Sequence, residues 1–75
     1  MNKKRRTRIA RIVDTLSPCV EELEDIKDEE DDSRENIPES LQGGELYEQS
    51  EECSDTLEDA IDNLRDVIDG LNGIT

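Results

Sequence analysis

The side chains best equipped for chemistry in this 75-residue chain are 22 carboxylates and two thiols. Counted from Asp28, acids and an amide fall at further ligand positions of a calcium loop of the EF-hand kind: Glu30, Asp32, Asn36 and Glu39. Such a loop needs glycine at its sixth position for a sharp turn, and this chain has Ser33 there. The spacing therefore favours a solvated acidic helix, and we expect no metal site.

The two thiols belong to Cys19 and Cys53, and the chain has no histidine. Neither cysteine has a second one nearby, which argues against a structural zinc site. Catalysis by a carboxylate requires a desolvated side chain in a cleft, and a small helical chain supplies no such cleft. No glycine-rich phosphate loop joins a strand to a helix. The sequence therefore predicts no enzyme and no cofactor.

Charge is divided unevenly along the chain, whose net charge is −13. Residues 1–11 carry six cations and no acid, whereas residues 12–75 carry three cations and all 22 acids, a net charge of −19. We expect a basic N-terminal arm over residues 1–8 and an acidic body over residues 9–75. No apolar segment of signal-peptide or membrane-spanning length follows the arm. The sequence predicts a cytoplasmic protein, without a membrane partner.

Three roles suit the basic arm. It has no aromatic residue to stack on bases, and the acidic body repels phosphates, so a nucleic-acid partner is not expected. A targeting patch is a second role. The third, which we favour, is internal neutralisation against an acidic surface on the second half of the chain. The candidate residues of that surface are Asp59, Asp62, Asp66 and Asp69.

Apolar residues recur in alternating steps of three and four along two segments, from Ile9 to Ile37 and from Leu46 to Ile74. This 3.5-residue period over four heptads is typical of coiled-coil packing. We predict an all-α fold, an antiparallel two-helix hairpin with helices over about residues 7–36 and 45–72 and a turn at 37–44. In this register both cysteines lie in the seam, too far apart along it to form a disulfide.

Proline and glycine residues indicate where the chain turns and whether the first helix is continuous. Ile37-Pro38 disfavours helix at residue 37, and Gly43-Gly44 supplies backbone freedom for the reversal. Pro18 interrupts the first ladder, where Ser17-Pro18 also suits a helix start. Because the heptad phase continues across Pro18, we expect one bent helix rather than two.

A second apolar line flanks each ladder. A face of three positions in seven is wider than one partner helix covers, so we expect the hairpin to form a homodimer as a four-helix bundle. The flanking residues are then the candidates for contact with a second copy or a foreign partner. They are Val13, Val20, Tyr47, Ile61 and Ile68.

Two segments carry a resemblance to a known family. The first runs from the acidic residues 28–30 to the turn NIPESLQ at residues 36–42, and the second is LEDAIDNL at residues 57–64. Together with the basic start, they resemble small acidic helical proteins of phages and prophages of Gram-positive, often gut, bacteria. The resemblance implies a helical hairpin and a phage setting, and no established chemistry.

Four functions compete on these grounds. The first is a protein-binding module, such as a phage inhibitor of a host defence or regulatory protein. The second is an acidic nucleic-acid mimic that occupies a DNA-binding groove, which the net charge of −19 over residues 12–75 supports. A passive structural or assembly component is the third, and nucleic-acid binding through the arm is the fourth. Salt separates the first two, because mimicry weakens steeply as salt rises.

Overall fold

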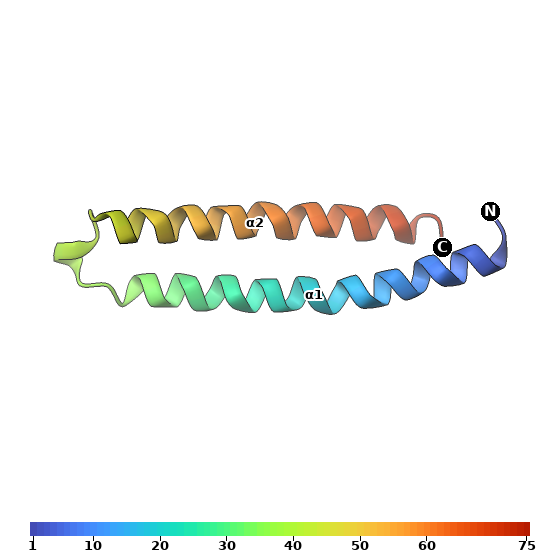
Figure 1. Cartoon of the computed structure of the whole chain (residues 1–75), viewed down its shortest axis with the longest axis horizontal. Coiled ribbons are helices and arrows are strands. Elements are labelled where there is room, and N and C mark those ends of the chain that lie inside the picture. Colours follow the sequence, from blue (N-terminus) through green and yellow to red (C-terminus); the bar gives the residue numbers. More distant parts are fainter.

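The computed structural model describes all 75 residues as two long helices joined by a short turn (Figure 1). Helix α1 spans Lys3–Glu35, a 3-10 turn η1 spans Glu39–Leu41, and helix α2 spans Glu45–Asn72. The helices run antiparallel in a rod of 60 × 14 × 12 Å. The predicted all-α hairpin is confirmed.

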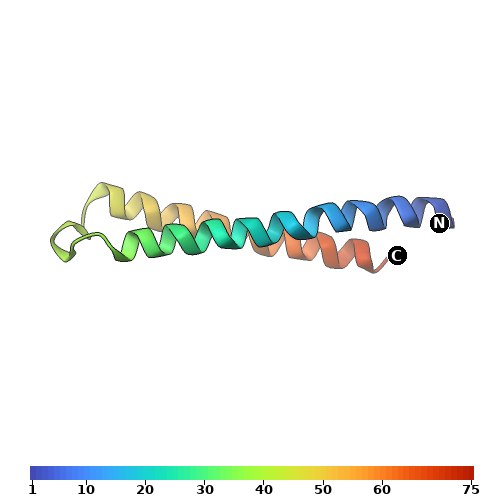
Figure 2. The ribbon, with the colours of Figure 1, turned by 90° about the horizontal axis from the view of Figure 1, so that it is seen from below.

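Helix α1 begins earlier than predicted, because Asn2 caps it. The side-chain oxygen of Asn2 accepts a hydrogen bond from the backbone N–H of Arg5 at 2.9 Å, which satisfies one of the free N–H groups of the first turn. The basic arm is therefore part of α1, not a separate segment before it. Figures 1 and 2 show this end of α1 extending past the end of α2.

Pro18 lies inside α1, which continues through it as predicted. Proline cannot donate a backbone hydrogen bond to the preceding turn. Next to Pro18, Ser17 donates its hydroxyl to the carbonyl of Val13 at 3.0 Å. Pro18 is exposed on the side away from α2, and Figure 1 shows α1 changing direction in this part of the helix.

The turn works without the unusual backbone that its glycines allow. No glycine has a positive φ. The N–H of Leu41 donates to the carbonyl of Pro38 at 2.8 Å, and the N–H of Gly44 donates to the carbonyl of Leu41 at 3.0 Å. A Cβ on Gly44 would lie 3.1 Å from that same carbonyl oxygen. Gly44 is needed for this close approach rather than for conformational freedom.

The seam between the helices differs from the one that the ladders predict. It combines half of each ladder with the flanking line, and its period is again three and four. On α1 its buried or half-buried residues are Ile9, Val13, Leu16, Val20, Leu23, Lys27, Glu30, Arg34 and, just beyond the helix, Ile37. On α2 they are Tyr47, Ser50, Ser54, Leu57, Ile61, Leu64, Ile68 and Leu71. We label these heptad positions a and d, with Val13 and Ile61 at position a.

This seam contradicts the prediction that the flanking apolar line of each helix lies outside the hairpin. The five residues expected outside lie inside the hairpin: Val13, Val20 and Ile61 are buried, and Tyr47 and Ile68 are half-buried. Cys19 and Cys53, expected inside, are exposed. Both cysteines are free.

The hairpin covers its own seam only partly. Five of the 75 residues are buried, and no side chain is buried completely. Small domains have little stability to spare, and apolar burial is its main source. The uncovered edge of the seam is therefore a place where further packing can stabilise the fold.

Candidate protein-binding face

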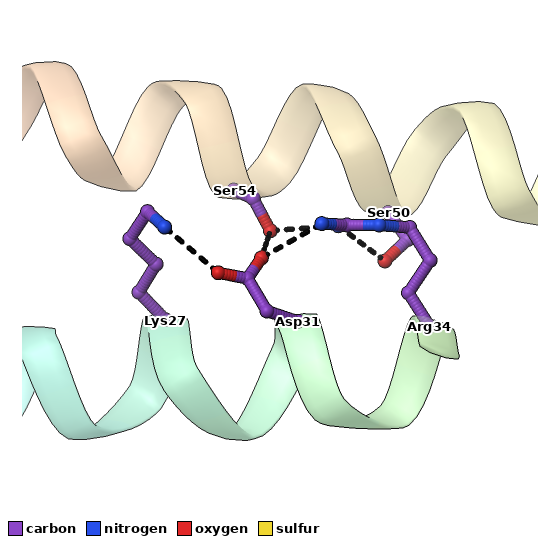
Figure 3. A network of polar contacts seen from close by, with 5 residues as sticks. All are labelled: Lys27, Asp31, Arg34, Ser50 and Ser54. Atoms are coloured by element: carbon purple, nitrogen blue, oxygen red, sulfur yellow. Dashed lines mark hydrogen bonds and ion pairs between the residues drawn. The ribbon is translucent and has the colours of Figure 1, made fainter. Parts of the chain in front are cut away.

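A polar network replaces apolar packing in the half of the seam next to the turn (Figure 3). The guanidinium of Arg34 donates to Asp31 at 2.8 Å, to Ser54 at 2.9 Å and to Ser50 at 3.2 Å. The hydroxyl of Ser54 donates to Asp31 at 2.6 Å, and the ammonium of Lys27 donates to the other Asp31 oxygen at 2.8 Å. The network therefore ties α1 to α2 across the seam.

Asp31 is the centre of this network. The hydrogen bond from Lys27, followed by that from Ser54, holds the pKa of Asp31 well below its usual range. The hydrogen bond to Asp31 in turn raises the pKa of Lys27. No buried side-chain polar atom lacks a partner. The half of the seam next to the turn is therefore a bonded polar layer.

The third cation of the acidic body also joins the helices. Arg65 of α2 forms an ion pair with Glu24 of α1, and lies 4.0 Å from Asp62 on its own helix. Lys27, Arg34 and Arg65 are the only cations beyond residue 11, and they make all four ion pairs of the structure. The remaining carboxylates of the body form no ion pair.

One side of the hairpin carries an exposed apolar strip. In an antiparallel pair, the local two-fold axis is perpendicular to the plane of the helices, so equal heptad positions lie on the same side of that plane. The ion pair between Glu24 and Arg65, both at position e, follows this rule. Position g lies on the other side. We call its apolar residues the open face: Ile12, Cys19 and Ile26 of α1, with Leu46, Cys53, Ala60 and Val67 of α2 and, just beyond that helix, Ile74.

The open face is uncovered in the single chain. The exposed fractions are 53% for Ile12, 43% for Ile26 and 49% for Val67. Half-buried leucines at position d, such as Leu16 and Leu64, are the part of the seam that borders this strip. The open face and these leucines are the two predicted ladders. The ladders therefore mark the side of the hairpin that lacks a partner, not its interior.

A second surface runs along the outer side of α2. Every position b and f of this helix is acidic, and all eight residues are exposed. They are Glu45, Glu48, Glu52, Asp55, Asp59, Asp62, Asp66 and Asp69. The last four were predicted from the sequence; the first four were not, although they follow the same spacing of three and four. We call this set the acidic stripe.

The basic arm does not neutralise the acidic stripe within the chain. None of the six cations of residues 3–11 forms an ion pair. The reason is length: α1 has 33 residues and α2 has 28, and the arm extends past the end of α2 (Figure 2). The predicted internal neutralisation is therefore wrong, and the arm is a cationic overhang.

The tip of the hairpin carries an apolar hollow of about 340 Å³. It lies between the turn and the first residues of α2, and two exposed leucines, Leu41 and Leu46, contribute to its wall. The calcium-loop spacing falls next to it, but residues 28–35 are helical and form no loop. The hollow joins the end of the open face at Leu46.

Comparisons of the chain with protein-family models, with curated proteins and with solved structures give no match. The resemblance to phage proteins therefore stays a prediction. Neither helix has an apolar stretch of the length and character required to cross a membrane. The surfaces that remain for function are the open face, the acidic stripe and the cationic overhang.

Proposed function

We propose that this chain is a non-enzymatic protein-binding module that packs helices of another polypeptide against its open face. The observation that carries this proposal is the uncovered apolar strip along both helices. Aqueous exposure of large apolar side chains is unfavourable, and contiguous strips of them on small proteins mark interaction sites. An amphipathic helix fits such a strip, because its own apolar residues have the same spacing.

The resemblance to phage proteins extends this proposal to a setting. In a phage, a small protein without catalytic groups acts by occupying the surface of another protein. We propose a host defence or regulatory protein as the bound partner and the bacterial cytoplasm as the place of binding.

Affinity capture tests the protein-binding function. The wild-type chain, an Ile26→Asp/Val67→Asp variant and an Asp25→Asn/Asp32→Asn control are immobilised and exposed to a Gram-positive lysate. The first variant changes only the open face, and the control changes only exposed outer positions. We expect a protein that the wild type and control retain and the open-face variant loses, identified by mass spectrometry. Equal retention on all three would reject the open face as the binding site.

Nucleic-acid mimicry is the second candidate, and the acidic stripe supports it. Its carboxylates recur every three or four residues, which at ~1.5 Å per residue is about 4.5–6 Å. A row of this kind suits a cationic groove that binds phosphates. In this case, neutralising Asp59, Asp62, Asp66 and Asp69 to Asn abolishes capture, and capture by the wild type declines steeply with salt. Loss of capture in the open-face variant alone would favour helix packing instead.

A further inference from the structure

The open side of α1 has three charge zones in sequence. Arg5 and Arg8 lie toward this side at the N-terminal end, at positions g and c. The apolar strip of the open face follows, and Thr15 and Glu22 border it at position c. Glu29 and Glu30 then continue the same side toward the turn, at positions c and d. The order is cationic, apolar and anionic over about 26 residues of one helix.

Such a strip is complementary to itself only when reversed. The centre between the cationic and anionic zones lies near residue 18, and the apolar zone from Ile9 to Ile26 has the same centre. A second α1 laid antiparallel on the first therefore places Arg8 opposite Glu29 and apolar residues opposite apolar residues. The contact occurs twice, because the two copies are related by a two-fold axis.

We propose that a second copy of this chain covers the open face with its basic arm at the opposite end. This inference rests on the open face of the proposed function and names one occupant for it. The product is a four-helix bundle in which α1 packs against α1 and α2 against α2, each pair antiparallel. Helix axes in such bundles are about 8–10 Å apart.

The alternative dimer places both arms at the same end. It brings two clusters of six cations together and leaves both anionic zones without cations. The opposite-end dimer instead places each cationic overhang beside the anionic zone of the partner, within the Debye length of about 8 Å at physiological salt. The overhang has no neighbour in its own chain, and the partner supplies one.

The free cysteines of the open face report which dimer forms. In the opposite-end dimer, Cys19 lies one residue from the centre, so the two Cys19 residues are about 3 Å apart along the axis on facing helices. Cys53 lies about 15 residues from the centre on α2, so the two Cys53 residues are about 45 Å apart along the axis. In the same-end dimer, α1 faces α2, and equal cysteines stand on diagonal helices.

The test uses two single-cysteine chains, Cys53→Ser and Cys19→Ser, and a bis-maleimide with a short spacer. Sedimentation equilibrium measures the oligomeric state of both chains before the reagent is added. We expect both to be dimers, with rapid covalent dimer formation through Cys19 and none through Cys53. A monomer, a dimer that does not link through Cys19, or a link through Cys53 would each overturn the inference.

This result is separable from the proposed function. Absence of a dimer, together with capture of a lysate protein that depends on the open face, leaves the proposed function and rejects self-association. Rapid linking through Cys19, together with equal capture by all chains, supports the dimer and rejects the foreign partner at this face.

Discussion

Asp31 bonds both half-buried cations of the seam and also a residue of the second helix. Its two oxygens accept hydrogen bonds from Lys27 and Arg34 on its own helix and from Ser54 on the other. Lys27 and Arg34 are half-buried at position a, where a cation is unfavourable unless it is paired. A polar residue at such a position also fixes the register of helices at a cost in stability. Asp31 therefore selects this seam.

Replacing Asp31 with Asn gives a pH-dependent loss of stability. The pKa of Asp31 is lower in the folded state than the ~3.9 of an unfolded chain. Its stabilising effect is therefore complete above pH ~4 and disappears as pH falls through the lower folded-state pKa. We expect Asp31→Asn to melt below the wild type at pH 7, and the gap to close in acid. Circular dichroism melts measure this, with Asp32→Asn as the control, since Asp32 forms no ion pair.

At the scale of the helices, the sequence predicts the type and the ends of each element better than the face that each helix turns toward the other. The two helices, the Ile37-Pro38 turn and the continuity through Pro18 are confirmed. The predicted seam is wrong because a helix with apolar residues at three positions in seven can form either of two seams. The two differ by a small rotation of the helix about its own axis. The deciding signal was polar: Lys27 and Arg34 are in phase with Val13 and Val20. Only the rotation seen in the structure gives these cations a place between the helices.

Two alanine substitutions distinguish the two seams. Val20 is buried in the observed seam, and Ile26 belongs to the predicted one. We expect Val20→Ala to lower the free energy of unfolding by about 1–3 kcal/mol, because it leaves a gap between the helices. In a chain kept monomeric by dilution, Ile26→Ala should change it by less than about 0.5 kcal/mol. Chemical denaturation measures both values, and the reverse order would restore the predicted seam.

Pro18 tests what the bend of α1 costs. It is exposed at position f, away from α2, so its ring contributes no packing across the seam. Alanine restores a backbone donor and removes the clash with the preceding turn. We expect Pro18→Ala to raise the free energy of unfolding by about 1–3 kcal/mol, whereas the nearby exposed control Thr15→Ala changes it by less than about 0.5 kcal/mol. No gain for Pro18→Ala would mean that the bend itself contributes to packing.

For the association of two whole molecules, the arrangement of the charges matters more than the net charge. Two chains of net charge −13 repel each other, and salt screens this repulsion. The cationic overhang and the anionic zone lie on the same side of α1, apart from one another within the chain. The sequence shows both charge blocks, but their use depends on the seam, which determines that Arg8 and Glu29 border the open face.

A charge swap between Arg8 and Glu29 tests this arrangement against net charge. Arg8→Glu takes the chain to −15, Glu29→Arg takes it to −11, and the double variant returns it to −13, since each substitution changes the charge by two. Repulsion between net charges alone would weaken the dimer in the first variant and strengthen it in the second. Pairing between Arg8 and Glu29 of two copies predicts that both single variants weaken it, by about three- to tenfold in Kd, because each creates a like-charge contact twice.

The double variant Arg8→Glu/Glu29→Arg separates the two explanations. Because the two side chains have exchanged places, the ion pair is restored with its charges reversed, so the Kd should return to within about threefold of the wild type. Sedimentation equilibrium at low salt measures all four chains, and the differences should shrink at high salt because screening weakens the pair. A tighter dimer for Glu29→Arg, with no recovery in the double variant, would show that the arms do not lie beside the anionic zone of a partner.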